Sequence, residues 1–201
     1  MKHKYHHGDL ANSLVTATVS LLQTRGVSQL SLREVARAAG VSHGAPAHHF
    51  GDKAGLLTAV AIQGYRLLAA QLMESQTLPG RTREQRLLDA GFAYIQFALS
   101  QTAYFTVMFQ PALTRSETPE YQAAARAAKT VLEKCIRDFL LNRSPGTPVR
   151  EKQIQATIIA LLSQVHGFAN LGLAGNLGDT ADDDHLQDIV LNMLSSITPR
   201  G

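Results

Sequence analysis

The sequence predicts an all-helical protein, and three observations support this fold class. Alternating apolar and polar runs of β-branched residues, the usual sign of strands, are scarce. Alanine, leucine, glutamine and arginine, most of which favour helices, dominate the long segments. Breaks that contain glycine or proline separate these segments at Gly26, Gly40, Gly51, 78–80, 115–119, 142–148 and 172–180. These breaks leave about nine helices.

Composition and cysteine usage narrow the class of protein. Of the 201 residues, 45% are hydrophobic and 17% are charged, which argues against a disordered chain. Cys135 is the only cysteine, so no internal disulfide can form and a cytoplasmic location is expected. Its apolar neighbours predict a buried thiol rather than a redox sensor. No run of about 18 uninterrupted apolar residues occurs, so no transmembrane helix is expected.

Charge is distributed unevenly along the chain, whose formal net charge is +3. Residues 1–53 contain six basic and three acidic side chains together with six of the eight histidines. Residues 150–201 contain three basic and six acidic side chains. A basic, histidine-rich N-terminal quarter indicates an anionic partner such as nucleic acid. His3, His6 and His7 lack acidic or cysteine ligands at a metal-binding spacing, so no metal or other cofactor is expected.

Capping signals mark the starts of several predicted helices. Ser31 and Glu34 form an S-x-x-E capping box, whose two side chains satisfy backbone N–H groups of the first turn. The Thr-Pro pairs at 118–119 and 147–148 each indicate an N-cap followed by proline at the first helical position. Thr180 precedes acidic residues that suit the N-terminal end of a helix dipole. These signals concern structure alone.

Residues 31–50 have the spacing of a helix-turn-helix motif. The small Ala36 is expected in the core, where it lets two helices cross closely. Gly40 permits the left-handed backbone of a tight turn, and Val41 fills the angle between the helices. Ser42 is expected to cap a short second helix, whose first turn would enter a major groove. An ordinary helical corner would show the same pattern.

Residues 5–65 resemble the N-terminal DNA-binding domain of the TetR family of transcriptional regulators. The resemblance rests on the segment YHHGDL, on an amphipathic first helix, and on the segment SLREVARAAGVSHGAPAHHFGDKAGLL. The second of these segments includes the G-V-S turn at 40–42, the pair at 49–50, and Lys53 at the start of a fourth helix. Ala47 departs from the family pattern, because members commonly have a tyrosine there for a phosphate contact.

A later segment, VHGFANLGLAG, resembles the W-H-G motif of one class of TetR-family C-terminal domain through His166 and Gly167. Leu162 stands where that motif has its tryptophan. The resemblance implies two domains. Residues 1–53 would form a three-helix DNA-binding domain with an N-terminal arm, and residues 54–201 would form a helical ligand-binding and dimerisation domain.

The resemblance and the chemistry of the side chains together assign DNA-contacting roles. Hydroxyl, imidazole and ammonium groups are expected to hold phosphates, and these belong to Ser31, Ser42, His49 and Lys53. Base edges would be contacted by His43, Gly44, Ala45 and His48. Arg33 is expected to contact the groove, with simple solvation as the alternative. Lys2 and Lys4 would either form an arm over the DNA or belong to a frayed terminus.

The resemblance also implies a homodimer whose C-terminal domain binds a small-molecule inducer. Candidate pocket residues are Phe92, Phe97, Phe105, Met108, Phe109 and His166, although such a cluster also suits an ordinary core. The last two helices carry apolar positions that would either pair with their copies in a partner chain or be buried within one chain. The predicted dimer residues are Ile158, Leu162, Leu186, Ile189, Val190, Met193, Leu194 and Ile197.

These features predict a ligand-responsive transcriptional regulator, most simply a repressor. It would bind a palindromic double-stranded operator as a homodimer and leave it when the inducer binds. The alternative is a ligand-independent helical DNA-binding or adaptor protein. An enzyme is not expected, because the sequence has no Ser-His-Asp pattern, phosphate-binding loop or zinc motif.

Overall fold

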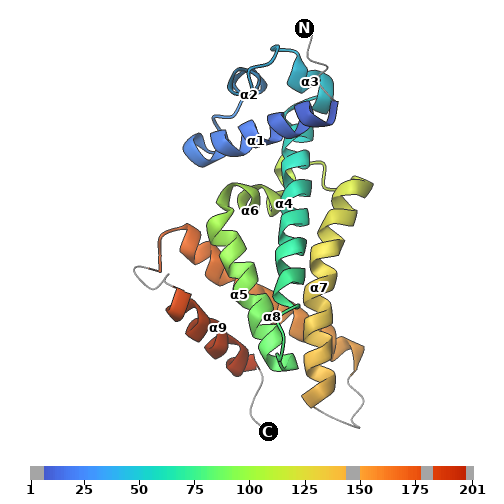
Figure 1. Cartoon of the computed structure of the whole chain (residues 1–201), viewed down its shortest axis with the longest axis vertical. Coiled ribbons are helices and arrows are strands. Elements are labelled where there is room, and N and C mark those ends of the chain that lie inside the picture. Colours follow the sequence, from blue (N-terminus) through green and yellow to red (C-terminus); the bar gives the residue numbers. More distant parts are fainter. Residues whose placement is uncertain (1–6, 144–149, 178–182, 198–201) are drawn as a thin grey trace. The chain divides into compact units, whose positions relative to one another are not determined.

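The computed structural model describes residues 7–143, 150–177 and 183–197 of the chain. Over these residues the protein has nine α-helices, one 3-10 helix and no strand, which confirms the predicted fold class (Figure 1). The helices are α1 (His7–Arg25), α2 (Leu32–Ala38), α3 (Ala45–Phe50), α4 (Lys53–Ser75), α5 (Arg83–Ser100), α6 (Thr102–Met108), η1 (Pro111–Leu113), α7 (Pro119–Arg143), α8 (Glu151–Leu173) and α9 (Asp183–Ile197).

The chain folds into two compact units. Unit 1 consists of Met1–Tyr65 and Gln101–Ala125, and unit 2 consists of Arg66–Ser100 and Arg126–Gly201. The chain therefore passes from one unit to the other within α4, between α5 and α6, and within α7. The predicted division into domains at residues 1–53 and 54–201 stays a prediction.

Unit 1 contains the helices for which the sequence predicts DNA binding. Helix α1 packs on α2 and α6, and α2 packs on α3 (Figure 1). The core of this unit includes the almost fully buried side chains of Leu14, Val35, Leu56 and Phe105. Burial of such a side chain contributes roughly 1.5–3 kcal/mol relative to exposure. Because helices as short as α2 and α3 are unstable alone, this packing holds them in place.

In unit 2, helices α5, α8 and α9 pack against one another, and Figure 1 shows α9 beside α5. Buried side chains come from all three helices, with Tyr94 on α5, Ile158 on α8 and Val190 on α9 among them. Gly91 on α5 allows the close approach of α9, because a Cβ at this position would lie 3.1 Å from a methyl group of Val190.

The predicted capping signals have different outcomes. The capping box is confirmed, because the N–H of Glu34 donates to Ser31 Oγ (3.3 Å) and the N–H of Ser31 donates to Glu34 Oε2 (3.2 Å). Pro119 is the first residue of α7, as predicted. The Thr-Pro pair at 147–148 and Thr180 lie outside the described residues, and α8 begins at Glu151.

The predicted role of Ser42 as a helix cap is wrong. Helix α3 begins at Ala45, and its N-cap is Gly44, which has no capping side chain. The carbonyl of Ser42 instead accepts the N–H of Ala45 (3.0 Å) in a turn before the helix. Pro46 is therefore the second residue of α3, where the N–H that proline lacks would have no partner within the helix.

Within the part of the chain that the structure describes, two helices, α4 and α8, are long and apolar enough to cross a membrane by length and composition alone. In α4, 56% of the most apolar window is buried inside the protein, which is usual for a core helix of a soluble protein. In α8 only 28% of that window is buried. The low burial of α8 shows that one of its apolar faces is exposed in the single chain.

The environment of Cys135 on α7 agrees with the predicted buried thiol. The side chain is buried, and its Sγ lies 3.1 Å from Oε1 of Gln76 within unit 2. Burial raises the pKa of the Cys135 thiol to about 11. Because the thiolate is the reactive form, this site suits packing rather than redox chemistry.

We expect the thiol of the native protein to react with a disulfide reagent at pH 8 about 100-fold more slowly than the thiol of the unfolded chain. The reagent releases a coloured thiolate when it reacts, and the rates of this release with and without urea give the ratio. Equal rates in the two conditions would contradict the burial and the raised pKa of Cys135.

Candidate nucleic-acid interface

The turn between α2 and α3 has the backbone geometry of a helix-turn-helix. Gly40 adopts φ +67°, a left-handed conformation that strains any residue with a side chain. The N–H of Val41 reaches back to the carbonyl of Ala36 (3.0 Å). Val35 and Ala36 have no exposed surface, so they form the contact that α2 makes with the rest of unit 1. This confirms the spacing argument for a tight turn at Gly40.

Helix α3 and the two residues before it carry the positions for which base contact is predicted. His43, Gly44 and His48 are exposed, and Ala45 is half-buried. The buried Pro46 anchors the opposite side of the helix. His48 and His49 lie edge to face, with ring centroids 5.6 Å apart. The arrangement leaves imidazole donors and a glycine backbone on one accessible surface.

The residues that the sequence assigns to phosphates differ in their exposure and in the hydrogen bonds that they already form. Ser42 is exposed, and His49 is half-buried. Ser31 is exposed, but its hydroxyl donates to Glu34 Oε2 (2.9 Å). Lys53 is half-buried, and its ammonium group donates to the carbonyl of Val27 (2.7 Å). Lys53 therefore ties α4 to the loop before α2, a structural role that the sequence did not reveal.

The charged groups of α2 include two exposed arginines, Arg33 and Arg37. Arg25 at the end of α1 pairs with Glu34 (2.9 Å). The hydrogen bond from Ser31, together with the charges of Arg25 and Arg37, lowers the pKa of the Glu34 carboxyl. Lys2 and Lys4, the predicted arm residues, lie outside the described residues.

Two family models match this chain. Residues 14–60 match the model of bacterial regulatory proteins of the tetR family. Residues 87–194 match the model of the tetracyclin repressor-like C-terminal domain. The chain belongs to the TetR family. TetR-family regulators bind DNA, and they typically dimerise and bind small molecules.

Solved structures share the fold over nearly the whole chain. A protein of unknown function from Rhodococcus sp. RHA1 is 27% identical, with a TM-score of 0.79 over 98% of this chain and 97% of that one. A tetR-family regulatory protein from Rhodococcus RHA1 is 18% identical (TM-score 0.67; 94% and 95% covered). The TetR-family regulator PfmR from Thermus thermophilus is 16% identical (TM-score 0.65; 92% and 96% covered). Curated proteins gave no significant match. The family and the fold are those of transcriptional regulators, not enzymes.

The ligand residues predicted for this TetR-family chain are divided between the two units. Phe105 and Met108 are almost fully buried in unit 1, and Phe109 is partly exposed there. Phe97 is fully buried in unit 2, where Phe92 is half-buried. The structure thus places most of this set in two separate cores.

His166 on α8 has a hydrogen-bond partner in the core of unit 2. Its Nδ1 lies 2.9 Å from the hydroxyl of Tyr94 on α5. Partial burial lowers the pKa of the His166 imidazole, and burial raises the pKa of the Tyr94 phenol. The arrangement favours a neutral histidine that joins α8 to α5, which was the structural alternative to ligand contact.

Hollows lie between the described helices of unit 2. A cavity of about 40 Å³ has walls from α5, α7, α8 and α9, which are mainly aliphatic and include Leu87, Gly91, Leu132, Ile136, Leu161 and Val165. A groove of about 260 Å³ between α5 and α9 includes Phe92 among its lining residues. Of the predicted ligand residues, Phe92 borders this groove.

The predicted dimer residues differ in burial within the single chain. Ile158, Leu186 and Val190 are buried within unit 2, so they belong to the core of the single chain. Leu162, Ile189 and Met193 are half-buried. The side chains of Leu194 and Ile197 lie outside the described residues.

The exposed apolar residues of α8 are not among the predicted dimer residues. Ile159 is 64% exposed and Leu171 is 48% exposed. Between them, Ser163 and Gly167 place small residues on the same exposed side of the helix. The apolar character of α8 on more than one side was visible in the sequence, but the sequence did not show which side would face inward.

Proposed function

We propose that this protein is a homodimeric transcriptional repressor that binds a palindromic operator and is released by a small-molecule inducer. The observation that carries the proposal is the exposed surface of α3, which follows the left-handed turn at Gly40 in a chain of the TetR family. Helices presented in this way lie in the major groove of DNA, and dimers read two half-sites.

The contacts proposed for each head combine base recognition and phosphate binding. Base edges are contacted by His43, Gly44, Ala45 and His48. Phosphates are held by Ser31, Ser42, His49 and Lys53, with Lys2 and Lys4 in the arm. For Arg33, which is exposed on α2 and is expected at the groove, we propose a contact with a phosphate at the edge of the groove. An ammonium group has three donors, so Lys53 keeps two of them for phosphate while it binds the carbonyl of Val27.

We expect the protein to enrich a palindromic duplex from a random pool, with an affinity that falls steeply as salt rises because phosphate contacts release counterions. Arg33→Ala should weaken binding to all duplexes and reduce the salt slope by about one per head. His43→Ala should change the preferred sequence instead. Fluorescence anisotropy on selected and random duplexes measures both effects. Equal affinity of the unaltered protein for selected and random duplexes would overturn the repressor proposal.

The exposed face of α8 supports a dimer. Gly167 lies inside this helix, where glycine costs about 0.5–1 kcal/mol relative to alanine. A Cβ at this position would meet no atom within 4 Å, so packing inside the described chain does not require glycine. Close approach of a second helix would require it. The exposed Ile159 and Leu171 flank this point and would be covered by the partner.

The dimer proposal predicts that Gly167→Leu converts the protein to a monomer and weakens operator binding, because the added side chain separates the two α8 helices. Ala127→Leu, which adds the same kind of bulk to an exposed position of α7, serves as the control. Sedimentation velocity at micromolar concentration measures the oligomeric state. A monomeric unaltered protein, or a dimeric Gly167→Leu variant, would contradict the interface.

The aliphatic cavity of unit 2 supports an inducer site, in place of the aromatic residues selected from the sequence. At about 40 Å³ the cavity is too small for a typical ligand, so the inducer must favour a conformation in which it is wider. Its mainly aliphatic walls suit an apolar molecule.

We expect some apolar compounds to raise the melting temperature of the protein and to lower its operator affinity together. Saturation at 100 times the Kd stabilises the native state by about 2.7 kcal/mol. Leu132→Phe, which fills the cavity, should abolish both effects, as measured by thermal shift and anisotropy. Compounds that stabilise the protein without changing operator affinity would favour the ligand-independent alternative.

A further inference from the structure

The connection between α6 and α7 is firmly anchored in unit 1. The carbonyl of Met108, the last residue of α6, accepts hydrogen bonds from the hydroxyls of Tyr65 on α4 (3.0 Å) and Tyr121 on α7 (2.9 Å). The two tyrosine rings are T-shaped, with centroids 5.4 Å apart. All three residues are buried. The segment that leaves α6 therefore starts from a fixed point.

Arg115, in this connection, holds the first turns of α4 at two points. Its backbone N–H donates to Oγ1 of the buried Thr58 (2.8 Å). Its guanidinium group donates to Oδ2 of Asp52 (2.9 Å). Both partners also form hydrogen bonds to the backbone of the first turns of α4. Thr58 donates to the carbonyl of Ala54, and Asp52 accepts the N–H of Gly55.

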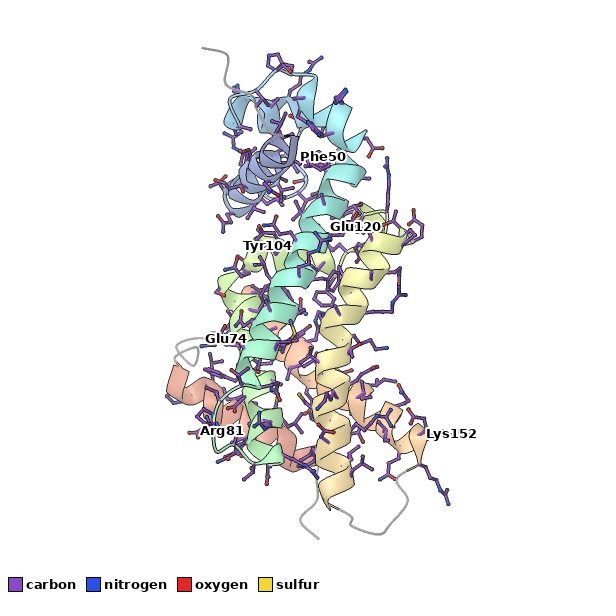
Figure 2. The ribbon with its side chains drawn as sticks, turned by 45° about the vertical axis from the view of Figure 1, so that its right-hand side comes forward. Phe50, Glu74, Arg81, Tyr104, Glu120 and Lys152 are labelled. Carbon is purple, nitrogen blue, oxygen red and sulfur yellow. The ribbon has the colours of Figure 1, made fainter. Side chains whose placement is uncertain are left out.

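The start of α4 in turn fixes the end of α3. Phe50 is the last residue of α3 and lies where α3 meets α4 (Figure 2). A Cβ at Gly55 would overlap the carbonyl oxygen of Phe50, so the two helices approach through bare backbone. The Arg115 guanidinium lies within 3.7 Å of the positions that a Cβ would occupy at Gly51 and Gly55. One side chain thus borders both glycines of the junction.

We propose that Arg115 is a positioning residue that fixes the orientation of α3 from the α6–α7 connection without contacting DNA. The importance of this orientation for operator binding rests on the proposed function. The Asp52–Arg115 pair carries no net charge, so its contribution to DNA binding would be geometric. The N–H of Gly55 and the Arg115 guanidinium lower the pKa of the Asp52 carboxyl, in agreement with a carboxylate that is held on both oxygens.

Asp52→Asn separates geometry from charge. The amide oxygen of asparagine still accepts the N–H of Gly55, but the ion pair with Arg115 is lost. If charge alone mattered, removal of an acidic group beside the DNA-binding helix would raise the affinity for DNA. The positioning role predicts the opposite sign. Because exposed ion pairs are weak, we expect a loss of at most about fivefold per head and about 25-fold for a dimer.

Arg115→Ala and Asp52→Asn are compared with Arg126→Ala, which removes the same charge as Arg115→Ala from an exposed site on α7. The first readout is hydrogen exchange of the α3 amides in the free protein, and the second is affinity for the selected duplex at several salt concentrations. Both Arg115→Ala and Asp52→Asn should speed exchange in α3 and lower affinity, without additivity in the double variant. Arg115→Lys, which keeps a cation beside Asp52, should restore part of the affinity. The salt slope should stay unchanged.

Three results would overturn the role of Arg115. The first is a higher affinity of Asp52→Asn for the duplex. The second is an effect of Arg115→Ala that equals the effect of Arg126→Ala. The third is a salt slope that falls by about one per head in Arg115→Ala, because such a fall marks a direct phosphate contact. If the Arg115 and Asp52 variants speed exchange in α3 but the unaltered protein selects no duplex, the positioning role of Arg115 is supported and the repressor proposal is refuted.

Discussion

The exposure of α3 depends on the left-handed turn at Gly40. Helices α2 and α3 have only seven and six residues, so neither has enough hydrogen bonds to be stable or to define a direction by itself. Their relative orientation comes from the turn, in which the N–H of Val41 reaches the carbonyl of Ala36, and from the buried contacts of Val35 and Ala36. A side chain at residue 40 would strain the backbone where the chain turns from α2 to α3.

The same physical device recurs at the other end of α3. Gly51 adopts φ +80°, and Gly55 lets the first turn of α4 approach the carbonyl of Phe50. Helix α3 is therefore held between two glycine-dependent junctions. Such junctions define where the chain goes, but glycine has no side chain that could add contacts. The additional contacts at the second junction come from Arg115, far away in the sequence.

Local features of this protein could be predicted from its sequence, because the residues that create them are close together. The Ser31–Glu34 capping box spans four residues, and the turn at Gly40 depends on a single backbone conformation. The prediction that Ser42 caps α3 is wrong because serine is common at N-caps but does not by itself start a helix. A turn follows Ser42, and α3 begins at Ala45. The long-range contacts were beyond prediction. Arg115 and Asp52 are 63 residues apart, and Tyr94 and His166 are 72 residues apart.

The two proposed activities of unit 2 meet in α8. Its inner side, with Ile158 and Val165, borders the aliphatic cavity, and its outer side, with Ile159 and Gly167, is the proposed dimer face. A ligand shifts a conformational equilibrium only when it binds one state more tightly, and here the preferred state would have a wider cavity. Widening the cavity would require one of its walls to move, and α8 is one of these walls. At Gly167 there is no side chain to absorb such a displacement, so it would pass directly to the helix of the partner.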